Sequence, residues 1–197
     1  VTAADMAILA ATGADQVNVR VPLRVAVIST GDELVEAGQS AKQDQIYDAN
    51  RPMLLSMITA MGHVPVDMGR CADDRAALSR VLDDATRNAD VVITSGGASA
   101  GDEDHVSSLM TEAGAMQMWR IAIKPGRPLA LGLWNNTPVF GLPGNPVAAM
   151  VCTLVFANPA MAQLAGAGWV APVGYDVPAN FTKSKKAGRR EYLRARM

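Results

Sequence analysis

The sequence predicts an α/β fold with three layers, in which helices cover both faces of a mostly parallel sheet. Continuous apolar runs such as RVAVIST (24–30) and DVVITS (90–95) are typical of strands that are buried on both faces. Helical patterns alternate with these runs along the chain. The apolar fraction of 49% over 197 residues is large enough for the core that such a fold needs.

The first residues, 1–20, predict a lead-in segment that precedes the main domain. Residues 2–14 read as a short helix closed by a glycine, and residues 15–21, with their alternating valines, read as a strand. The sequence begins with Val1 and stops at Met197 within a strand-like pattern. We therefore expect it to be a piece of a longer protein with a missing N-terminal region.

The main domain is expected at residues 21–167, where strand and helix patterns follow one another. A proline in the first turn favours the helix that begins at about Asn50, and leading aspartates cap the next helix. The pair Asn135-Asn136 predicts a turn between the last two strands. Strands are expected at 24–30, 63–69, 90–95, 116–123, 129–133 and 139–142, and helices at 50–61, 73–89, 105–113 and 147–167.

The last segment, residues 168–197, has strand-like pieces, prolines and a basic cluster but no helical period. We interpret it as the start of a small C-terminal β domain. Its basic residues lack interleaved aromatic side chains, which argues against a nucleic-acid patch.

Charge and cysteine content limit the classes of partner. Eighteen basic and nineteen acidic residues give a net charge of −1, which argues against recognition of nucleic acid or a membrane surface by bulk charge. Cys71 and Cys152 lack metal-ligand spacing and are expected to be buried thiols in the reducing cytoplasm. Asn158 and Pro159 interrupt the apolar stretch 147–167, so we expect a buried or subunit-facing helix and no membrane span.

Four unusual loops follow predicted strand ends: TGDE (30–33), SGGASAGDED (95–104), KPGRP (124–128) and GLPGNP (141–146). In an open parallel sheet, ligands bind outside the carboxyl ends of the strands. We therefore expect these four loops to converge on one crevice.

The loop GLPGNP opens a helix and is suited to bind an anion. Asn145 is a good N-cap, and Pro146 suits the first helical position. A helix N-terminus carries unpaired N–H groups and partial positive charge, and Gly144 leaves the backbone bare enough for an anion to approach. An ordinary turn is the alternative interpretation of the same residues.

The loop SGGASAGDED suits an oxyanion and a divalent cation. Its glycines let successive N–H groups point at one oxyanion, with Ser95 and Ser99 as further donors. It matches neither the dinucleotide-binding nor the P-loop motif. Asp102, Glu103 and Asp104 follow, and Mg²⁺ is typically bound by one or two carboxylates together with phosphate oxygens. A flexible turn and helix N-capping are the alternative interpretations.

Charged residues on the other two loops extend this expected site. Asp32 and Glu33, at the end of the first buried strand, are placed to complete the cation site. Lys124 and Arg127 lie on a loop that two prolines stiffen, which suits a doubly charged oxyanion. A rigid surface turn with solvated charges is the alternative for KPGRP.

Five segments, in their order along the chain, resemble the molybdopterin molybdenumtransferase family, that is, the MoeA and gephyrin E-domain proteins. They are VAVISTGDEL, IYDANRPML, SGGASAGDEDHV, AIKPGRPLALG and GLPGNPVAA. The resemblance covers about residues 15–197. It implies a MogA-like α/β domain that binds adenylated molybdopterin, inserts molybdate into the dithiolene, cleaves the pyrophosphate with help from Mg²⁺ and releases AMP. It also implies a cytoplasmic homodimer whose early domains cover the partner's crevice, and a MogA-type adenylyltransferase as a further partner.

The resemblance assigns roles to individual residues by their position. Asp104, Glu33 and Asp74 are expected to be catalytic, Asp73 pairs with Asp74, and Asp104 and Glu33 are expected to hold the metal. Substrate contacts are expected from Thr30, Gly31, Asp32, Ser95, Gly96, Gly97, Ser99, Gly101, Lys124, Pro125, Arg127, Pro143, Gly144, Asn145, Pro146 and Arg189.

Two positions depart from the family pattern. Arg127 stands where lysine is usual, so the charge is kept but the planar guanidinium reaches the ligand differently. Ala148 stands where many members have a serine, so one hydroxyl contact to the oxyanion is missing.

Two other functions stay open at this point. A MogA- or MoaB-like adenylyltransferase shares the α/β domain and would make the adenylated pterin from ATP, although KPGRP and the segment after the long helix argue against it. A non-catalytic scaffold is the second alternative, because gephyrin-type E domains also bind a receptor partner.

Overall fold

The computed structural model describes residues 1–96, 105–113, 116–118, 121–169, 174–185 and 187–193. A six-stranded sheet in the order β4-β1-β5-β9-β8-β6 forms its centre. The first four strands are parallel, whereas β8 and β6 run antiparallel to their neighbours. The predicted mostly parallel sheet is confirmed. The strand bounds are β1 Arg24–Thr30, β4 Val64–Cys71, β5 Val91–Ser95, β6 Met116–Met118, β8 Ala130–Trp134 and β9 Thr137–Leu142.

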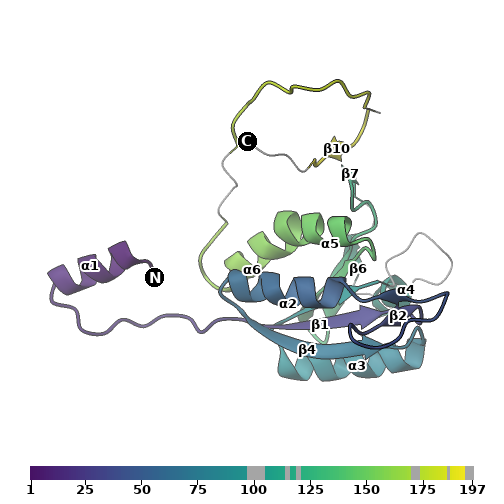
Figure 1. Cartoon of the computed structure of the whole chain (residues 1–197). Helices are drawn as coiled ribbons and strands as arrows, with labels where there is room; N and C mark the ends of the chain where they lie inside the picture. The colour runs from purple at the N-terminus through teal and green to yellow at the C-terminus, as the bar shows by residue number, and fades with distance from the viewer. Residues whose placement is uncertain (97–104, 114–115, 119–120, 170–173, 186, 194–197) are drawn as a thin grey trace.

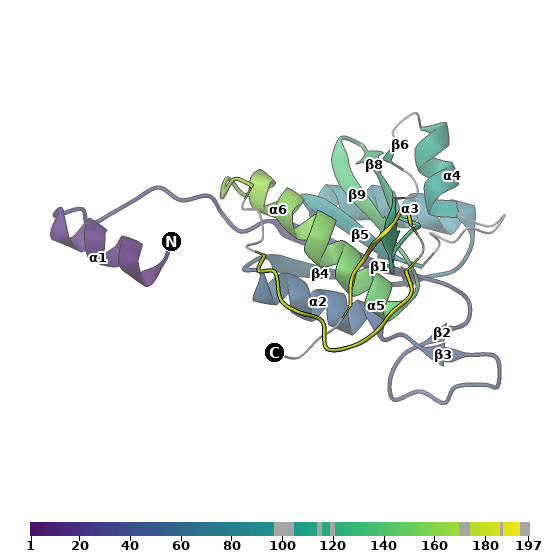
Figure 2. The same cartoon turned by 90° about the horizontal axis from the view of Figure 1, so that it is seen from above.

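Helices cover both faces of this sheet (Figures 1 and 2). Successive residues of a strand point to opposite faces. Val25 and Val27 of β1 therefore belong to the core cluster with α2, α5 and α6, whereas Ala26 and Ile28 belong to the cluster with α3 and α4. The helix bounds are α2 Asn50–Ala60, α3 Arg75–Asn88, α4 His105–Glu112, α5 Pro146–Cys152, the π-helical turn η1 Thr153–Ala157 and α6 Asn158–Leu164.

The helical stretch Pro146–Leu164 crosses one face of the sheet. Within the described part of the chain, it is the one helix long and apolar enough to span a membrane by length and composition. Its Ala149, Cys152, Ala157 and Met161 side chains are buried in the core cluster against the sheet. One face of this stretch therefore packs on the sheet while Leu154 and Leu164 are exposed, which is compatible with the expected buried or subunit-facing helix.

Strands β8 and β9 form a hairpin that reverses at Asn135 and Asn136, as predicted. These residues have positive φ angles of 48° and 64°, which a two-residue type I′ turn requires. Trp134 Nε1 donates a hydrogen bond of 2.7 Å to Asp83 Oδ1 on α3. This bond holds the hairpin against the helix below it.

The lead-in segment carries one wrong prediction. Helix α1 (Ala3–Ala11) forms as expected and has no buried residue, but the predicted strand at 15–21 is absent from these described residues. An alternating pattern produces a strand only where a neighbouring strand lets it bury one face. Here the segment is an extended connection between α1 and β1 (Figure 1), and its valines Val17, Val19 and Val21 are all exposed.

Two short parallel strand pairs lie outside the central sheet. β2 (Leu34–Val35) pairs with β3 (Ile46–Tyr47) in the segment between residues 31 and 49, where the sequence predicts neither a strand nor a helix. β7 (Ile123–Lys124) pairs with β10 (Arg190–Glu191) near the end of the chain. The strand predicted at 116–123 is thus divided between β6 in the central sheet and β7 in this pair, because one apolar run does not reveal a change of partner.

Both cysteines are free and buried, as expected. Cys152 packs beneath the KPGRP loop, where its Sγ lies 3.6 Å from the Gly126 carbonyl oxygen. Burial raises the pKa of the Cys152 thiol to about 12. The pKa of Cys71 is also raised, first by burial and then by the Asp74 carboxylate.

We expect both thiols of the native protein to be unreactive. A thiol reacts as its thiolate, and a raised pKa together with burial leaves very little accessible thiolate at pH 8. A chromogenic disulfide reagent should titrate less than one thiol per chain in native buffer and both thiols in 6 M guanidinium chloride. Rapid native labelling of either cysteine would contradict the closed packing of α5 against KPGRP or of β4 against α3.

Candidate functional site

The carboxyl ends of three parallel strands meet at one edge of the sheet. Ser29 of β1 is in register with Ser95 of β5, and Ser95 is in register with Leu142 of β9. TGDE, the SGG loop and GLPGNP leave the sheet here. KPGRP enters β8, whose first residue Ala130 pairs with Gly141 near the end of β9. The described residues of the four loops therefore start from or lead to the same edge of the sheet, whereas their convergence on one crevice stays a prediction.

Asn50 joins two of these loops through its side chain. It lies at the start of α2, is buried, and donates from Nδ2 to Ser95 Oγ and to the Gly144 carbonyl oxygen, both at 2.7 Å. A buried amide bonded in this way fixes the distance between the end of β5 and the loop GLPGNP. The sequence analysis did not single out Asn50. The signal lay in the DAN triplet of IYDANRPML, where Asp48 accepts from two N–H groups in the first turn of α2.

Gly96 allows the loop after β5 to pass close to β1. Its φ angle is +93°, and a Cβ atom there would collide with the Thr30 carbonyl oxygen. A Cβ at Gly144 would lie 4.0 Å from the Gly96 Cα. The backbone segments at the ends of β1, β5 and β9 are therefore closely spaced here. They can approach one another because Gly96 and Gly144 carry no side chain.

Asn145 caps the long helix as predicted, but with a consequence the sequence analysis missed. Its Oδ1 accepts from Val147 N at 3.0 Å and from Ala148 N at 3.1 Å, and its carbonyl accepts from Ala149 N at 2.9 Å. Pro146 has no N–H group. The first N–H groups of this helix are therefore already paired, and the expectation that they face an anion is not supported by these hydrogen bonds.

Acidic residues gather at the open end of β1. Asp32 Oδ1 accepts a hydrogen bond of 3.1 Å from Asp73 N, and His105 Nε2 lies 3.8 Å from Asp73 Oδ1. Asp74, a predicted catalytic residue, is the N-cap of α3 and accepts from Ala77 N at 2.7 Å. The structure thus brings Asp32 and Asp73 together and gives Asp74 a capping role.

The Glu33 carboxylate folds back over the backbone of its own loop. Its Oε2 would lie 2.5 Å from a Cβ atom at Gly31, whose φ angle is +139°. Among the described residues, no group of three or more His, Cys, Asp and Glu side chains is placed to hold a metal. The predicted residues Gly97, Ser99, Gly101 and Asp104 lie outside the described residues.

The Arg51 side chain holds segment 31–49, which connects β1 to α2, in place. Its guanidinium donates to Glu36 at 2.7 Å, to Asp67 at 2.8 Å and to Asp48 at 3.4 Å. The pKa of Arg51 is raised, chiefly by the hydrogen bond to Asp67. Segment 31–49 is therefore tied both to α2 and to β4 by one side chain.

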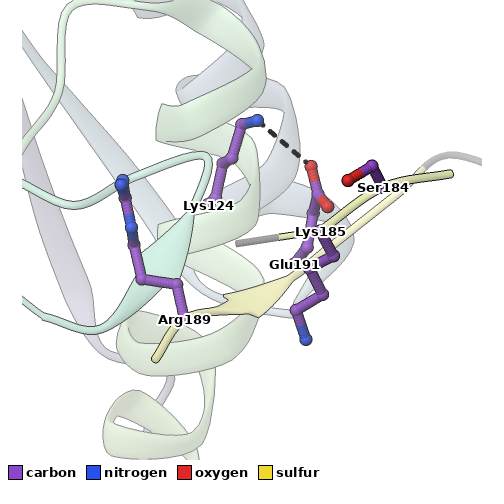
Figure 3. A pocket seen from close by; sticks show the side chains of 5 residues that line it. All are labelled: Lys124, Ser184, Lys185, Arg189 and Glu191. Carbon is purple, nitrogen blue, oxygen red and sulfur yellow. Dashed lines mark ion pairs between the residues drawn. The ribbon is translucent and has the colours of Figure 1, made fainter. Parts of the chain in front are cut away.

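A basic pocket of about 410 Å³ lies beside β7 and β10. It is lined by Lys124, Ser184, Lys185, Arg189 and Glu191. Figure 3 shows the Lys124 side chain extending toward Glu191, to which it is ion-paired at 3.4 Å, whereas Lys185 runs away from this pair in the same view. Pairing of β7 with β10 thus combines a residue of KPGRP with residues of the C-terminal segment.

A second cavity of about 330 Å³ adjoins the KPGRP loop and is lined in part by Arg127 and Arg189. Arg189 lines both cavities. Three of the expected substrate-contact residues thus line these two cavities, Lys124 in the first, Arg127 in the second and Arg189 in both. Ala148, at the position of the missing serine, is buried and its side chain offers no polar contact.

The basic pocket and the acidic residues at the end of β1 are linked through the first turns of the long helix, Pro146–Leu164. A Cβ atom at Gly126 would lie 2.5 Å from Cys152 Sγ and 3.5 Å from the Ala148 carbonyl oxygen. KPGRP therefore packs against the long helix, about one turn after the point where GLPGNP begins it. Among the described residues, no hydrogen bond or ion pair joins Lys124 or Arg127 to the TGDE loop.

Comparison with known proteins identifies relatives for most of the chain. Residues 26–163 match the family described as "Probable molybdopterin binding domain". A molybdopterin molybdenumtransferase of Haemophilus influenzae is 37% identical over 98% of this chain. The match spans 48% of that relative, so the chain corresponds to about half the length of the curated protein.

Solved structures support the same fold. The molybdopterin biosynthesis MoeA protein from Pyrococcus horikosii superposes with a TM-score of 0.73 at 36% identity, over 84% of this chain and 41% of that one. The tungsten cofactor synthesizing protein MoaB from Pyrococcus furiosus has a TM-score of 0.51 at 15% identity, over 74% of this chain and 97% of that one. The second likeness concerns the fold alone.

Replacement of Asn50 should destabilise the edge of the sheet. Asn50→Ala removes two short hydrogen bonds, a buried one to Ser95 Oγ and a partly buried one to Gly144 O, so we expect a loss of about 2 kcal/mol in the free energy of unfolding. Urea denaturation measures it. The matched control is Asn88→Ala, which removes amide bonds at the exposed end of α3 and should cost about 0.5 kcal/mol or less. Equal losses in both variants would contradict a special role for Asn50.

Proposed function

The chain belongs to the family of probable molybdopterin binding domains, and on this premise we propose that it serves the insertion of molybdate into adenylated molybdopterin with release of AMP. This is a late step of molybdenum cofactor biosynthesis. The Haemophilus influenzae relative is named a molybdopterin molybdenumtransferase, and the activity proposed here is a transferase reaction of that kind.

Beyond the fold, the cations that line the two cavities support this proposal. Lys124 and Arg189 line one pocket beside the β7–β10 pair, and Arg127 and Arg189 line the adjoining cavity. Cations from two segments far apart in sequence thus face one small volume. Such an arrangement suits a compact dianion, for which charge-assisted hydrogen bonds are strongest.

We assign the oxyanion to Lys124, Arg127 and Arg189. Lys124 contributes a compact point charge, whereas Arg127 and Arg189 present planar forks of N–H donors. Arg127 is exposed. Pro125, which follows Lys124 directly, limits the freedom of the backbone that carries these charges.

We assign the pterin and its phosphates to the edge where the strand ends meet. Thr30, Gly31 and Gly96 lie at the ends of β1 and β5, where Gly96 passes close to the Thr30 carbonyl, and Asn50 joins Gly144 to Ser95 at the same edge. The remaining predicted contacts here are Asp32, Ser95, Pro143, Asn145 and Pro146. The helix dipole contributes partial positive charge at this point even though the first N–H groups are already paired.

Mg²⁺ is proposed as the metal, held by Glu33 and Asp104. One or two protein carboxylates suffice for Mg²⁺, because waters and phosphate oxygens complete its coordination. Glu33 fits this requirement, since its carboxylate lies beside Gly31 at the open end of β1. When bound, the ion would neutralise charge on the pyrophosphate. Asp32, held by Asp73 N, would orient the same region.

Three further features belong to the proposal. The protein acts as a homodimer, in the cytoplasm, and it receives adenylated molybdopterin from a MogA-type adenylyltransferase. The buried, reduced cysteines are compatible with a reducing compartment.

Loss of the Lys124 charge should weaken molybdate binding. Lys124 is largely exposed, so its contribution is screened, and we expect Lys124→Ala to lower the affinity about fivefold at low salt and less at 0.5 M salt. Arg127→Lys keeps the charge and should have a milder effect. Isothermal titration with molybdate measures these affinities.

The matched control for this experiment is Lys42→Ala, which removes an exposed lysine from segment 31–49 and should leave molybdate affinity unchanged. Unchanged affinity in Lys124→Ala would place the oxyanion elsewhere. Strong binding of ATP without binding of molybdate would favour an adenylyltransferase instead.

A further inference from the structure

Glu191 contributes a carboxylate to a pocket otherwise lined by cations and a serine. It accepts from Lys183 Nζ at 2.8 Å and lies 3.4 Å from Lys124 Nζ, and both contacts are made by the same oxygen, Oε1. Its side chain is only 11% exposed, whereas that of Lys124 is 63% exposed. The Glu191 side chain is thus less exposed than that of Lys124, and Lys124 approaches it from the solvent-exposed side of the pocket.

The backbone holds this carboxylate in place. Glu191 and Lys124 are register partners in the parallel β7–β10 pair, so their side chains lie on the same face. Tyr192 N donates to the Lys124 carbonyl at 2.8 Å, and Arg190 N donates to the Ala122 carbonyl at 2.9 Å. Contact between the two charges can therefore be broken by side-chain rotation while the strands stay paired.

The carboxylate is charged at neutral pH. The pKa of Glu191 is lowered, first by the hydrogen bond from Lys183 and then by that from Lys124. An oxyanion that enters the pocket meets Lys124 already paired. It must either share that ammonium group with Glu191, against like-charge repulsion, or replace the carboxylate there.

We propose that Glu191 is the exchangeable counter-ion of Lys124, which occupies the lysine while the pocket is empty and gives it up to an incoming oxyanion. This inference rests on the oxyanion site proposed above and deepens it. Lys183 makes the exchange feasible, because it remains with Glu191 when Lys124 turns to the ligand. Glu191 thereby keeps the Lys124 ammonium group near the pocket between binding events and prevents the oxyanion from binding too tightly to be passed on.

The test compares molybdate binding by the whole chain with that of Glu191→Gln at pH 7.5 and low salt. Glutamine keeps the size and an acceptor oxygen but removes the charge. Removing one unit charge near a solvated site changes binding by a factor of about five, so we expect affinity to rise about fivefold. The gain should be smaller for perrhenate, a tetrahedral oxyanion with one negative charge, because repulsion by Glu191 scales with ligand charge.

A double-mutant cycle separates a local exchange from a long-range field. In the Lys124→Ala background, Glu191→Gln should raise molybdate affinity less than about twofold, because the pair that it breaks is already gone. The matched control is Glu112→Gln, which removes an equal charge from the exposed pair with Arg75 on the α3–α4 side and should leave affinity unchanged. Hydrogen exchange at the Tyr192 N–H group reports whether β10 stays paired with β7 in each variant. Glu191→Ala serves as a second variant that removes the same charge.

Each outcome decides the inference. Tighter binding by Glu191→Gln or Glu191→Ala, with the gain lost in the Lys124→Ala background, supports it. Unchanged or weaker binding in both variants overturns it, as does an equal gain with and without Lys124. If the unmodified chain binds molybdate and the variants do not differ from it, the inference falls and the proposed function stands. If no form of the chain binds molybdate, both fall.

Discussion

The side-chain amide of Asn50 is the contact on which the edge of the sheet that we propose as the binding site depends. A parallel sheet brings strand ends to one edge, but it does not determine how far apart the loops beyond them lie. One buried nitrogen donates to the end of β5 and to the loop after β9 and thereby sets that distance. The side chain comes from the first residue of α2, so the position of this helix on the sheet and the spacing of the loops are linked. A shift of α2 would therefore act directly on the position of Gly144.

The central fold could be predicted from the sequence because its signals are local and strong. Strands buried on both faces need consecutive apolar residues, and the runs 25–28 and 91–93 supply them. The strand expected at 15–21 was wrong because its pattern requires a neighbouring strand, and the extended segment found there exposes its valines. β10 is only two residues long and finds its partner far back in the chain, which no local pattern reveals.

The site was predictable to a different degree. Glycine, proline and charged residues after strand ends indicated the loops, and the topology brings the strand ends from which their described residues extend to one edge. Side-chain roles were harder, because capping residues and ligand-binding residues are the same types. Asp74 caps α3, and Asn145 uses both its side chain and its carbonyl on the helix that it starts. The importance of Asn50 depends on two partners, Ser95 and Gly144, that lie far from it in sequence.

The hairpin of β8 and β9 has a practical consequence. Because it reverses direction, it sends two loops to the binding edge and leaves its own turn, at Asn135 and Asn136, at the other end of the strands. Asn136 is exposed, while Asn135 and Trp134 anchor the turn to α3 through Asp83. A fluorophore or a surface tether attached at Asn136 would therefore immobilise or report on the molecule while leaving the ligand-facing loops unobstructed.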